Sequence, residues 1–305
     1  MSGITRRMLM AGAAGLGTAA VLPRWLHASV QVGDWQIDTL SDGNLVLPAD
    51  FILGPMPADE VAPILARHGL SMGDPLTPPC NVTLLRGQGR AVLFDAGSGL
   101  SFQPSVGALP DALEALGVPP EAITDVIFTH AHPDHLWGVL DDFDEPFFYE
   151  ARHYIGAGEL DYWLDSATVS TIGAGRQTFA VGAARRLAAL DGIIETFDDG
   201  AEVLPGVIAA LTPGHTPGHM SFAVAGQGGS AMILGDAIGN HHVGFEAPNL
   251  LSGSDQDQPL AAETRLALLD RIVADDMTIV GFHLPGGGIG QAERMQGAYR
   301  FVQHG

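Results

Sequence analysis

Three histidines and one aspartate lie within six residues near the middle of the chain. They are His130, His132, Asp134 and His135, and they follow an apolar run at 126–128 that predicts a buried strand. In the tight loop after a strand, side chains two positions apart can converge, so His130 and His132 can share one cation. Asp134 and His135 would then turn toward a second. Imidazole and carboxylate are the ligands expected of zinc or a similar divalent metal.

Three further residues of the same chemical types occur downstream, each after an apolar, strand-like run. His215 follows the run at 207–211 in a Gly/Pro-rich loop, Asp236 follows 232–234, and His283 follows 278–282. Rigid strands can hold such loop residues in fixed positions. Five histidines and two aspartates suffice for two cations of three or four ligands each, provided that one carboxylate bridges them.

This order of ligands resembles the metallo-β-lactamase-fold hydrolase superfamily, whose pattern is His-x-His-x-Asp-His, a later His, a bridging Asp and a final His. The resemblance covers nearly the whole chain after the amino terminus. It implies an α/β fold, a four-layer αββα sandwich with the site at the edge between the two sheets. It also implies that His130, His132 and His215 hold one divalent ion and Asp134, His135 and His283 the other, with Asp236 between them. Zinc is the default metal, although the same ligands accept manganese, cobalt or iron.

The expected chemistry is metal-dependent hydrolysis. Two divalent ions roughly 3.5–4 Å apart can share a water and lower its pKa toward neutrality, which yields a nucleophilic hydroxide. Asp236 would bridge the ions, and Asp134 would bind one ion and could pass a proton to the leaving group. No Gly-x-Ser-x-Gly motif precedes a predicted helix, so the sequence does not support a serine nucleophile.

Within the superfamily the chain is most similar to the methyl parathion hydrolase and lactonase-like branch. The similarity lies in segments 34–43, 159–164, 233–236, 282–285 with 288–290, and 297–302. In that branch aromatic residues line the pocket, which implies that Trp163 and, by a looser match, Phe102 contact the substrate. The implied substrates are small neutral esters, lactones or organophosphate triesters. One departure is the absence of the tyrosine that acyl-homoserine lactonases carry shortly after the bridging Asp, because Ala237 to Asn240 follow Asp236 here.

Two kinds of alternative remain. The same fold hosts β-lactamases and thioesterases, but β-lactamases generally lack an equivalent of Asp236, and thioesterases grip glutathione with basic residues that this chain has in short supply. The second alternative is an exported metal-binding protein without turnover. A panel of substrates offered to the metal-loaded protein would separate these hypotheses.

Composition limits the partners of the protein. The chain has 305 residues, a net charge of −21, and fourteen basic residues that are all arginine. An anionic surface repels phosphate backbones, so we expect a small-molecule substrate and no nucleic-acid partner. The lone Cys80 permits no internal disulfide and is predicted to be a core thiol. The resemblance alone implies that the chain can form a homodimer.

The amino terminus is predicted to be a targeting segment. Arg6 and Arg7 precede a Gly/Ala-rich apolar run to about Val21 that is too short to span a membrane, and Ala28 offers a cleavage site. Twin arginines before such a run resemble a bacterial Tat signal; a Sec signal or an uncleaved anchor is the alternative. We therefore expect a signal peptide at 1–28 and one domain at 29–305. That domain would be periplasmic or secreted, with no stable membrane span after processing.

Hydrophobic periodicity predicts the main elements. Strands are expected near 35–40, 45–47, 80–85 and 91–94, the last two as a hairpin, and helices at 58–68, 111–116, within 151–164, at 183–190 and at 261–274. Asp95 is placed either to orient a ligand imidazole or simply to form a turn. His219 is interpreted as a loop-packing residue, His241 and His242 as an exposed loop pair, and His153 as a structural residue in a helical stretch.

Overall fold

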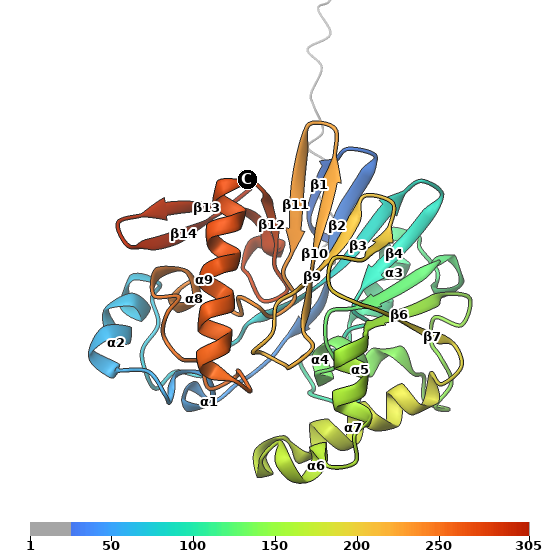
Figure 1. Cartoon of the computed structure of the whole chain (residues 1–305), viewed down its shortest axis with the longest axis horizontal. Coiled ribbons are helices and arrows are strands. Elements are labelled where there is room, and N and C mark those ends of the chain that lie inside the picture. The colour runs from blue at the N-terminus through green and yellow to red at the C-terminus, as the bar shows by residue number, and fades with distance from the viewer. Residues whose placement is uncertain (1–25, 305) are drawn as a thin grey trace, which may run out of the picture.

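The computed structural model describes residues 26–304, whose strands form two seven-stranded sheets (Figure 1). The first sheet has the spatial order β1 to β7, with strands at Leu26–Val32, Trp35–Asn44, Pro79–Gly87, Arg90–Phe94, Asp125–Phe128, Arg152–Gly156 and Ile194–Phe197. Strands β1 to β4 pair antiparallel, whereas β4 to β7 pair parallel. Because parallel strands point the same way, the loops after β4, β5 and β6 leave the sheet at one edge.

The second sheet is built from the carboxyl-terminal third of the chain. Its order runs from β14 to β8, with strands β8 to β14 at Glu202–Leu204, Val207–Leu211, Met220–Gly226, Gly229–Ile233, Thr278–Val280, Ile289–Met295 and Ala298–Gln303. All neighbours pair antiparallel except β11 and β12, which are parallel. The loops after β11 and β12 therefore also leave at a common edge.

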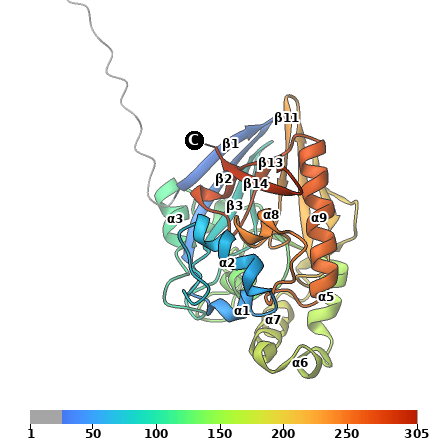
Figure 2. The same ribbon diagram turned by 90° about the vertical axis from the view of Figure 1, so that its left-hand side faces the viewer.

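Helices cover the outer faces of both sheets. They are α1 to α9 at Ala49–Leu53, Ala58–Arg67, Leu109–Leu116, Pro133–Leu136, Ala157–Leu164, Thr168–Thr171, Gln177–Ala189, Val243–Glu246 and Gln258–Ala274. Short 3-10 turns lie at Pro120–Ala122, Trp137–Val139, Ala174–Arg176 and Gly286–Gly288. Helix α9 lies across the second sheet, while α5, α6 and α7 cluster beside the first (Figure 1), and α1 and α2 face the viewer in Figure 2.

Strand β5 shows how the layers form. Val126 and Phe128 point into the core under α3, α5 and α7, whereas Ile127 points the other way, into the core between the two sheets. Side chains alternate between faces along a strand, and a strand buried on both faces is therefore apolar throughout. A third core joins α9 to the second sheet, and a fourth packs α1 and α2 around Leu76, Val243 and Leu250.

This arrangement confirms the αββα expectation and the hairpin of β3 and β4. Cys80 is a free, buried thiol, and burial raises its pKa to about 12. The interpretation of His153 as helical is wrong, because this residue lies in β6, where it pairs with Val126 and Ile194. Residues 151–164 contain both strand β6 and helix α5. The alternating spacing of the strand and the helical spacing of apolar residues therefore overlap where the two elements meet.

The twin-arginine motif lies outside the described residues, so the export signal remains a prediction. Residues 29–32 of β1, which follow the predicted cleavage point, pair with Asp38 to Trp35 of β2. No helix in the range 26–304 is both long enough and apolar enough to cross a membrane.

Candidate metal centre

The motif at 130–135 forms the turn between β5 and α4. His132 is extended, with φ −68° and ψ 161°, and Pro133 occupies the first position of the short helix. Proline favours this position because its φ is already helical and it needs no amide donor there. The turn therefore directs His130 and His132 to one side, and Asp134 and His135 enter the site from the first turn of α4.

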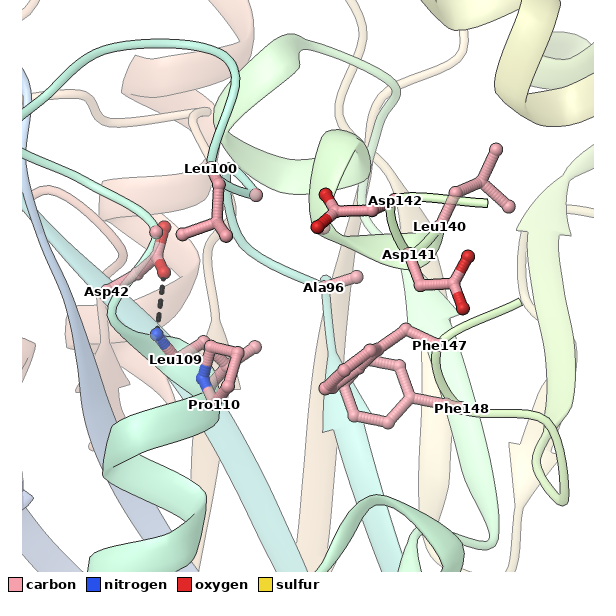
Figure 3. Close-up of a pocket in the computed structure, with 13 residues that line it drawn as sticks. Asp42, Ala96, Leu100, Leu109, Pro110, Leu140, Asp141, Asp142, Phe147 and Phe148 are labelled. Carbon is pink, nitrogen blue, oxygen red and sulfur yellow. Dashed lines mark hydrogen bonds between the residues drawn. The ribbon is translucent and has the colours of Figure 1, made fainter. Parts of the chain in front are cut away.

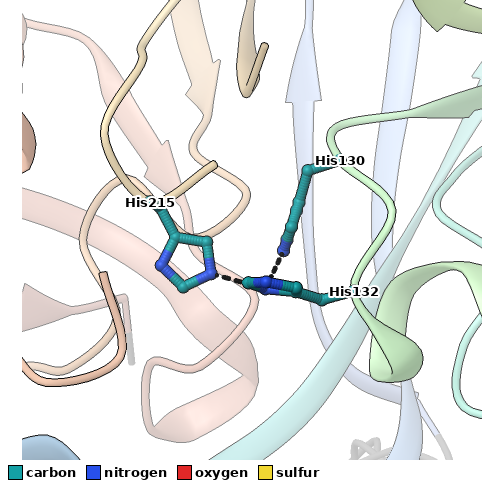
Figure 4. Close-up of side chains that lie close together, drawn as sticks. All are labelled: His130, His132 and His215. Atoms are coloured by element: carbon teal, nitrogen blue, oxygen red, sulfur yellow. Dashed lines mark hydrogen bonds between the residues drawn. The ribbon is translucent and has the colours of Figure 1, made fainter. Parts of the chain in front are cut away.

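The first cluster consists of His130, His132 and His215. Nε2 of His130 lies 3.0 Å from Nδ1 of His132, which lies 2.9 Å from Nε2 of His215. The ring nitrogens point at one another from two separate loops (Figure 4). All three side chains are buried, so their nitrogens meet away from bulk water.

The second cluster consists of Asp134, His135, Asp236 and His283, whose ligand atoms all lie within 4.8 Å of one another. Nε2 of His283 is 3.2 Å from Oδ2 of Asp134, and Nε2 of His135 is 3.2 Å from Oδ1 of Asp236. The other oxygen of Asp236, Oδ2, lies 3.3 Å from Nε2 of both His283 and His215. Asp236 thus touches both clusters, which is the position that a bridging carboxylate needs.

The donor atoms fit two divalent ions. Oδ2 of Asp134, Nε2 of His135 and Oδ1 of Asp236 are buried and have no hydrogen-bond partner among the described residues. Buried polar atoms are normally satisfied, so a convergent group of unsatisfied ones indicates a ligand. Imidazole nitrogen and carboxylate oxygen are ligand types that suit zinc.

The two clusters differ in the direction in which their surroundings shift the pKa values of their histidines. Burial, reinforced by neighbouring imidazoles, lowers the pKa of His130 and His132 well below the usual value, which favours the neutral form that binds metals. Burial also acts to lower the pKa of His135, but the charges of Asp236, Asp134 and Asp95 outweigh it and raise this pKa to about 10. The pKa of His283 is likewise raised, above all by Asp236. Without a metal ion, protons on His135 and His283 balance the negative charge of the carboxylates. Metal binding must therefore displace these protons.

Partners outside the clusters fix the ligand rings. Nδ1 of His135 donates to Oδ2 of Asp95 at 2.7 Å, and Nδ1 of His283 donates to the carbonyl oxygen of Pro79 at 2.7 Å. Such bonds set the tautomer and leave Nε2 free for the metal. Asp95 is therefore placed as expected; it also accepts from the amide of Thr129 at 2.8 Å and adopts φ 69°.

Asp255 is a partner that sequence reasoning missed. Its Oδ1 lies 3.0 Å from Nδ1 of His215, and its Oδ2 accepts from Arg265 at 2.8 Å. Arg265 also donates to the carbonyl oxygens of Pro248 and Leu250. This chain of bonds ties His215 to α9.

Glu159 is a second missed residue, and it joins the two histidine loops. One oxygen of this buried carboxylate accepts from the amide of Ala131 at 2.9 Å and from the indole of Trp163 at 2.6 Å. The other accepts from the hydroxyl of Thr216 at 2.7 Å and from the amide of Gly218 at 3.1 Å. Burial raises the pKa of Glu159, but all four hydrogen bonds oppose that shift.

His219 is not a ligand in either cluster. It is buried, and its Nε2 accepts from the amide of Asp236 at 2.9 Å while its Nδ1 lies 2.8 Å from Oγ1 of Thr212. Gly235, at φ 53°, lets the chain approach this ring, because a Cβ there would lie 2.6 Å from Nε2 of His219. The loop-packing interpretation was therefore incomplete, since His219 also holds the backbone of Asp236, the residue that touches both clusters.

The interpretation of His241 and His242 as an exposed pair is wrong. His242 is buried and His241 half-buried, and both rings pack against His68, His241 edge-on and His242 tilted. His68 is held by Glu246, with Nε2 2.6 Å from Oε1. The satellite core around α1 and α2 brings these loops together, which local sequence does not reveal.

A cavity of about 350 Å³ opens onto both clusters. Five ligands line it, namely His132, Asp134, His215, Asp236 and His283. The rest of its wall is mainly apolar: Leu45, Val46, Leu47, Pro48, Phe51, Ile52, Pro78, Phe102, Pro133 and Phe179, with Gln103, Arg176, Gly239 and Ser254. Phe102 thus lies where a substrate contact is expected. Trp163 does not, because it is 1% exposed and packs behind His132 with its indole bonded to Glu159. Expecting Trp163 to touch the substrate is not supported, since α5 turns this side chain into the core.

A second cavity, of about 150 Å³, contains none of the seven ligands (Figure 3). Its buried carboxylate, Asp42, already accepts from the amides of Ser98 and Leu109, both at 2.8 Å. The remaining wall is mostly apolar, with Asp141 and Asp142 at one side (Figure 3). The candidate metal ligands therefore line only the larger of these two cavities.

Comparisons with known proteins agree with this geometry. Residues 77–283 match the family described as the metallo-beta-lactamase superfamily. An N-acyl homoserine lactonase from Bacillus sp is 23% identical over 257 residues, covering 83% of this chain and 90% of that protein. Among solved structures, the dizinc quorum-quenching lactonase AidC, in complex with a product, has a TM-score of 0.84 at 20% identity and covers 92% of this chain and 98% of its own. The hydrolase AbOPH of the beta lactamase superfamily has a TM-score of 0.83 at 27% identity, with coverages of 91% and 97%.

Proposed function

Because the chain belongs to the metallo-β-lactamase superfamily and is a metal-dependent hydrolase, we propose that it opens lactones and related small neutral esters. The observation that carries this proposal is the pair of ligand clusters sharing Asp236 at the base of a mainly apolar cavity. An apolar wall favours neutral, partly apolar substrates over anions. Similarity to the Bacillus lactonase supports a lactone in particular.

In this proposal His130, His132 and His215 hold one ion, Asp134, His135 and His283 the other, and Asp236 both. When bound, two such ions, with zinc as the first candidate, polarise the scissile carbonyl and lower the pKa of water. Asp134 is shielded from bulk solvent but lines the cavity, so it can carry a proton toward the leaving group. Phe102 would pack against the substrate, whereas Trp163 supports His132 from behind.

A substrate panel tests the proposal. Metal-loaded protein should hydrolyse lactones and aryl esters faster than cephalosporins or thioesters. Paraoxon-like triesters belong in the panel because Phe51, Phe102 and Phe179 in the wall suit an aryl leaving group. His132→Ala should abolish activity and reduce metal content, whereas His304→Ala, at an exposed position, should change neither. A metal-loaded protein that is inert to the whole panel would instead favour a metal-binding role.

Export to the periplasm through a twin-arginine signal and homodimerisation belong to the same proposal. Both rest on the sequence and its resemblance. Export fits a metalloenzyme, because the Tat route carries proteins that have already folded.

A further inference from the structure

The cavity wall contains an arginine, Arg176, that makes no salt bridge to a carboxylate of the described residues. Among residues 26–304, nine arginines pair with a carboxylate, and only Arg176 and Arg186 do not. Arg186 is buried and donates to the carbonyl oxygens of Trp137 and Gly182, with its guanidinium 4.2 Å from the Trp137 ring. Packing therefore accounts for Arg186 but leaves Arg176 unexplained.

Arg176 lies at the end of the 3-10 turn before α7 and lines the cavity with His132 and His215. Its Nη2 donates to the carbonyl oxygen of Gly253 at 2.7 Å, and its guanidinium lies 5.7 Å from the centre of the Phe51 ring. A guanidinium has five N–H donors in a fixed fork. Only one of these hydrogen bonds is made to a described residue, so the anchored fork keeps donors for a ligand.

The other polar side chains of this wall are already engaged. Oε1 of Gln103 accepts from the amide of Val46 at 2.9 Å, and the hydroxyl of Ser254 lies 2.8 Å from that of Ser252. Arg176 is the one cation other than the ligand histidines in the lining, within a chain of net charge −21. A wall with one strong donor and many apolar contacts recognises one acceptor group beside an apolar chain.

We propose that Arg176 determines specificity by donating to a neutral carbonyl oxygen that the substrate carries in addition to its scissile bond. Such a substrate is a lactone bearing an amide or ketone beside the ring, with an apolar chain that packs along Phe51, Phe102 and Phe179. This inference rests on the proposed lactonase function. A neutral acceptor fits better than a carboxylate because the wall around Arg176 is mainly apolar.

The test compares two γ-lactones of equal chain length, one with an acylamino group on the ring and one with a plain alkyl chain. Arg176→Met keeps the apolar stem but removes the donors. It should lower kcat/KM for the acylamino lactone about 10- to 100-fold, which is the scale of a hydrogen bond to a charged group, and change that for the alkyl lactone less than about threefold. Arg176→Lys should recover part of the loss. Arg185→Met, which removes an exposed arginine of α7 paired with Asp144, is the matched control and should leave both rates unchanged.

Binding without turnover gives an independent readout. The lactam analogue of the acylamino substrate should inhibit the Arg176→Met variant more weakly than the wild type, with metal content unchanged. Equal losses on both lactones, or an unchanged rate on the acylamino lactone, would overturn the role of Arg176. A wild-type enzyme that cleaves neither lactone would instead refute the proposed function.

Discussion

At the residue scale, the orientation of the metal ligands depends on the residues that hydrogen-bond to their rings. Asp95 and Asp255 each hold one ring, and Asp95 does so from a left-handed backbone conformation with φ 69°. Asparagine and aspartate tolerate this conformation better than most residues. Asp95→Asn is thus a substitution that changes charge and bonding with little added backbone strain.

We expect Asp95→Asn to weaken binding of the second metal by about 10- to 100-fold, because the amide no longer fixes His135 with a charged acceptor. Chelator competition, read out as metal content, measures this effect. Asp38→Asn serves as control, since Asp38 is a buried carboxylate paired with Arg86 and belongs to neither cluster. An unchanged metal affinity in Asp95→Asn would show that packing alone orients His135.

Sequence predicted the ligands and the supporting Asp95, but not Asp255 or Glu159, which also support them. The ligands follow strands, so type and local spacing identified His130, Asp236 and the others. Asp255 reaches His215 across 40 positions, and Glu159 reaches Ala131 across 28, so neither contact leaves a local pattern. The resemblance placed Trp163 in the pocket wall, whereas the structure buries this side chain behind His132, at 1% exposure.

At the element scale, Glu159 connects the first turn of α5 to both histidine loops. Its four donors come from the loops at 129–133 and 212–219 and from Trp163 one turn later. Gly218 permits the close approach, because a Cβ there would lie 2.2 Å from the amide nitrogen of Glu159. The loops are therefore fixed relative to each other by one carboxylate.

Glu159→Gln should destabilise the protein by about 2 kcal/mol or more, because one acceptor oxygen becomes an NH₂ group that faces buried donors. Thermal unfolding of the metal-loaded protein measures the loss. Glu195→Gln, an exposed position in β7, is the control. A melting temperature equal to that of the wild type would mean that the loops hold their positions without this carboxylate.

At the scale of the whole molecule, the ligand set joins the two sheets. Four ligands follow β5 of the first sheet, whereas His215, Asp236 and His283 follow β9, β11 and β12 of the second. Metals held by both halves stabilise only the folded state. Apolar runs in the sequence predicted strands in both sheets, among them 126–128 and 278–282, but the packing of the sheets onto each other depends on long-range contacts.

Chelation should therefore lower the melting temperature. A metal present at 1,000 times its dissociation constant adds about 4 kcal/mol, which corresponds to roughly 10 °C for a domain of this size. Calorimetry with and without chelator, followed by zinc addition, measures the shift and its reversal. If the shift persists in a variant that lacks both Asp236 and His132, the chelator acts elsewhere.

Acid sensitivity of the fold should depend in part on His153. This side chain is buried in β6, neither ring nitrogen has a hydrogen-bond partner among the described residues, and burial lowers its pKa to about 4. The unfolded chain takes up the proton near pH 6.5. The stability that the neutral His153 ring contributes is therefore fully present above that pH and is lost as the pH falls toward 4. Replacing the ring with phenylalanine removes this titration while keeping a similar volume.

His153→Phe should therefore resist acid better than the wild type. Between pH 7 and pH 4.5 its free energy of unfolding should fall by on the order of 2 kcal/mol less. Urea unfolding at both pH values measures the difference, and metal release at low pH cancels because both proteins share it. His304→Gln, at an exposed position, should follow the wild type. Parallel pH profiles for His153→Phe and wild type would assign the acid sensitivity to other histidines whose pKa values burial lowers, such as His241, to about 4, and His242, to about 3.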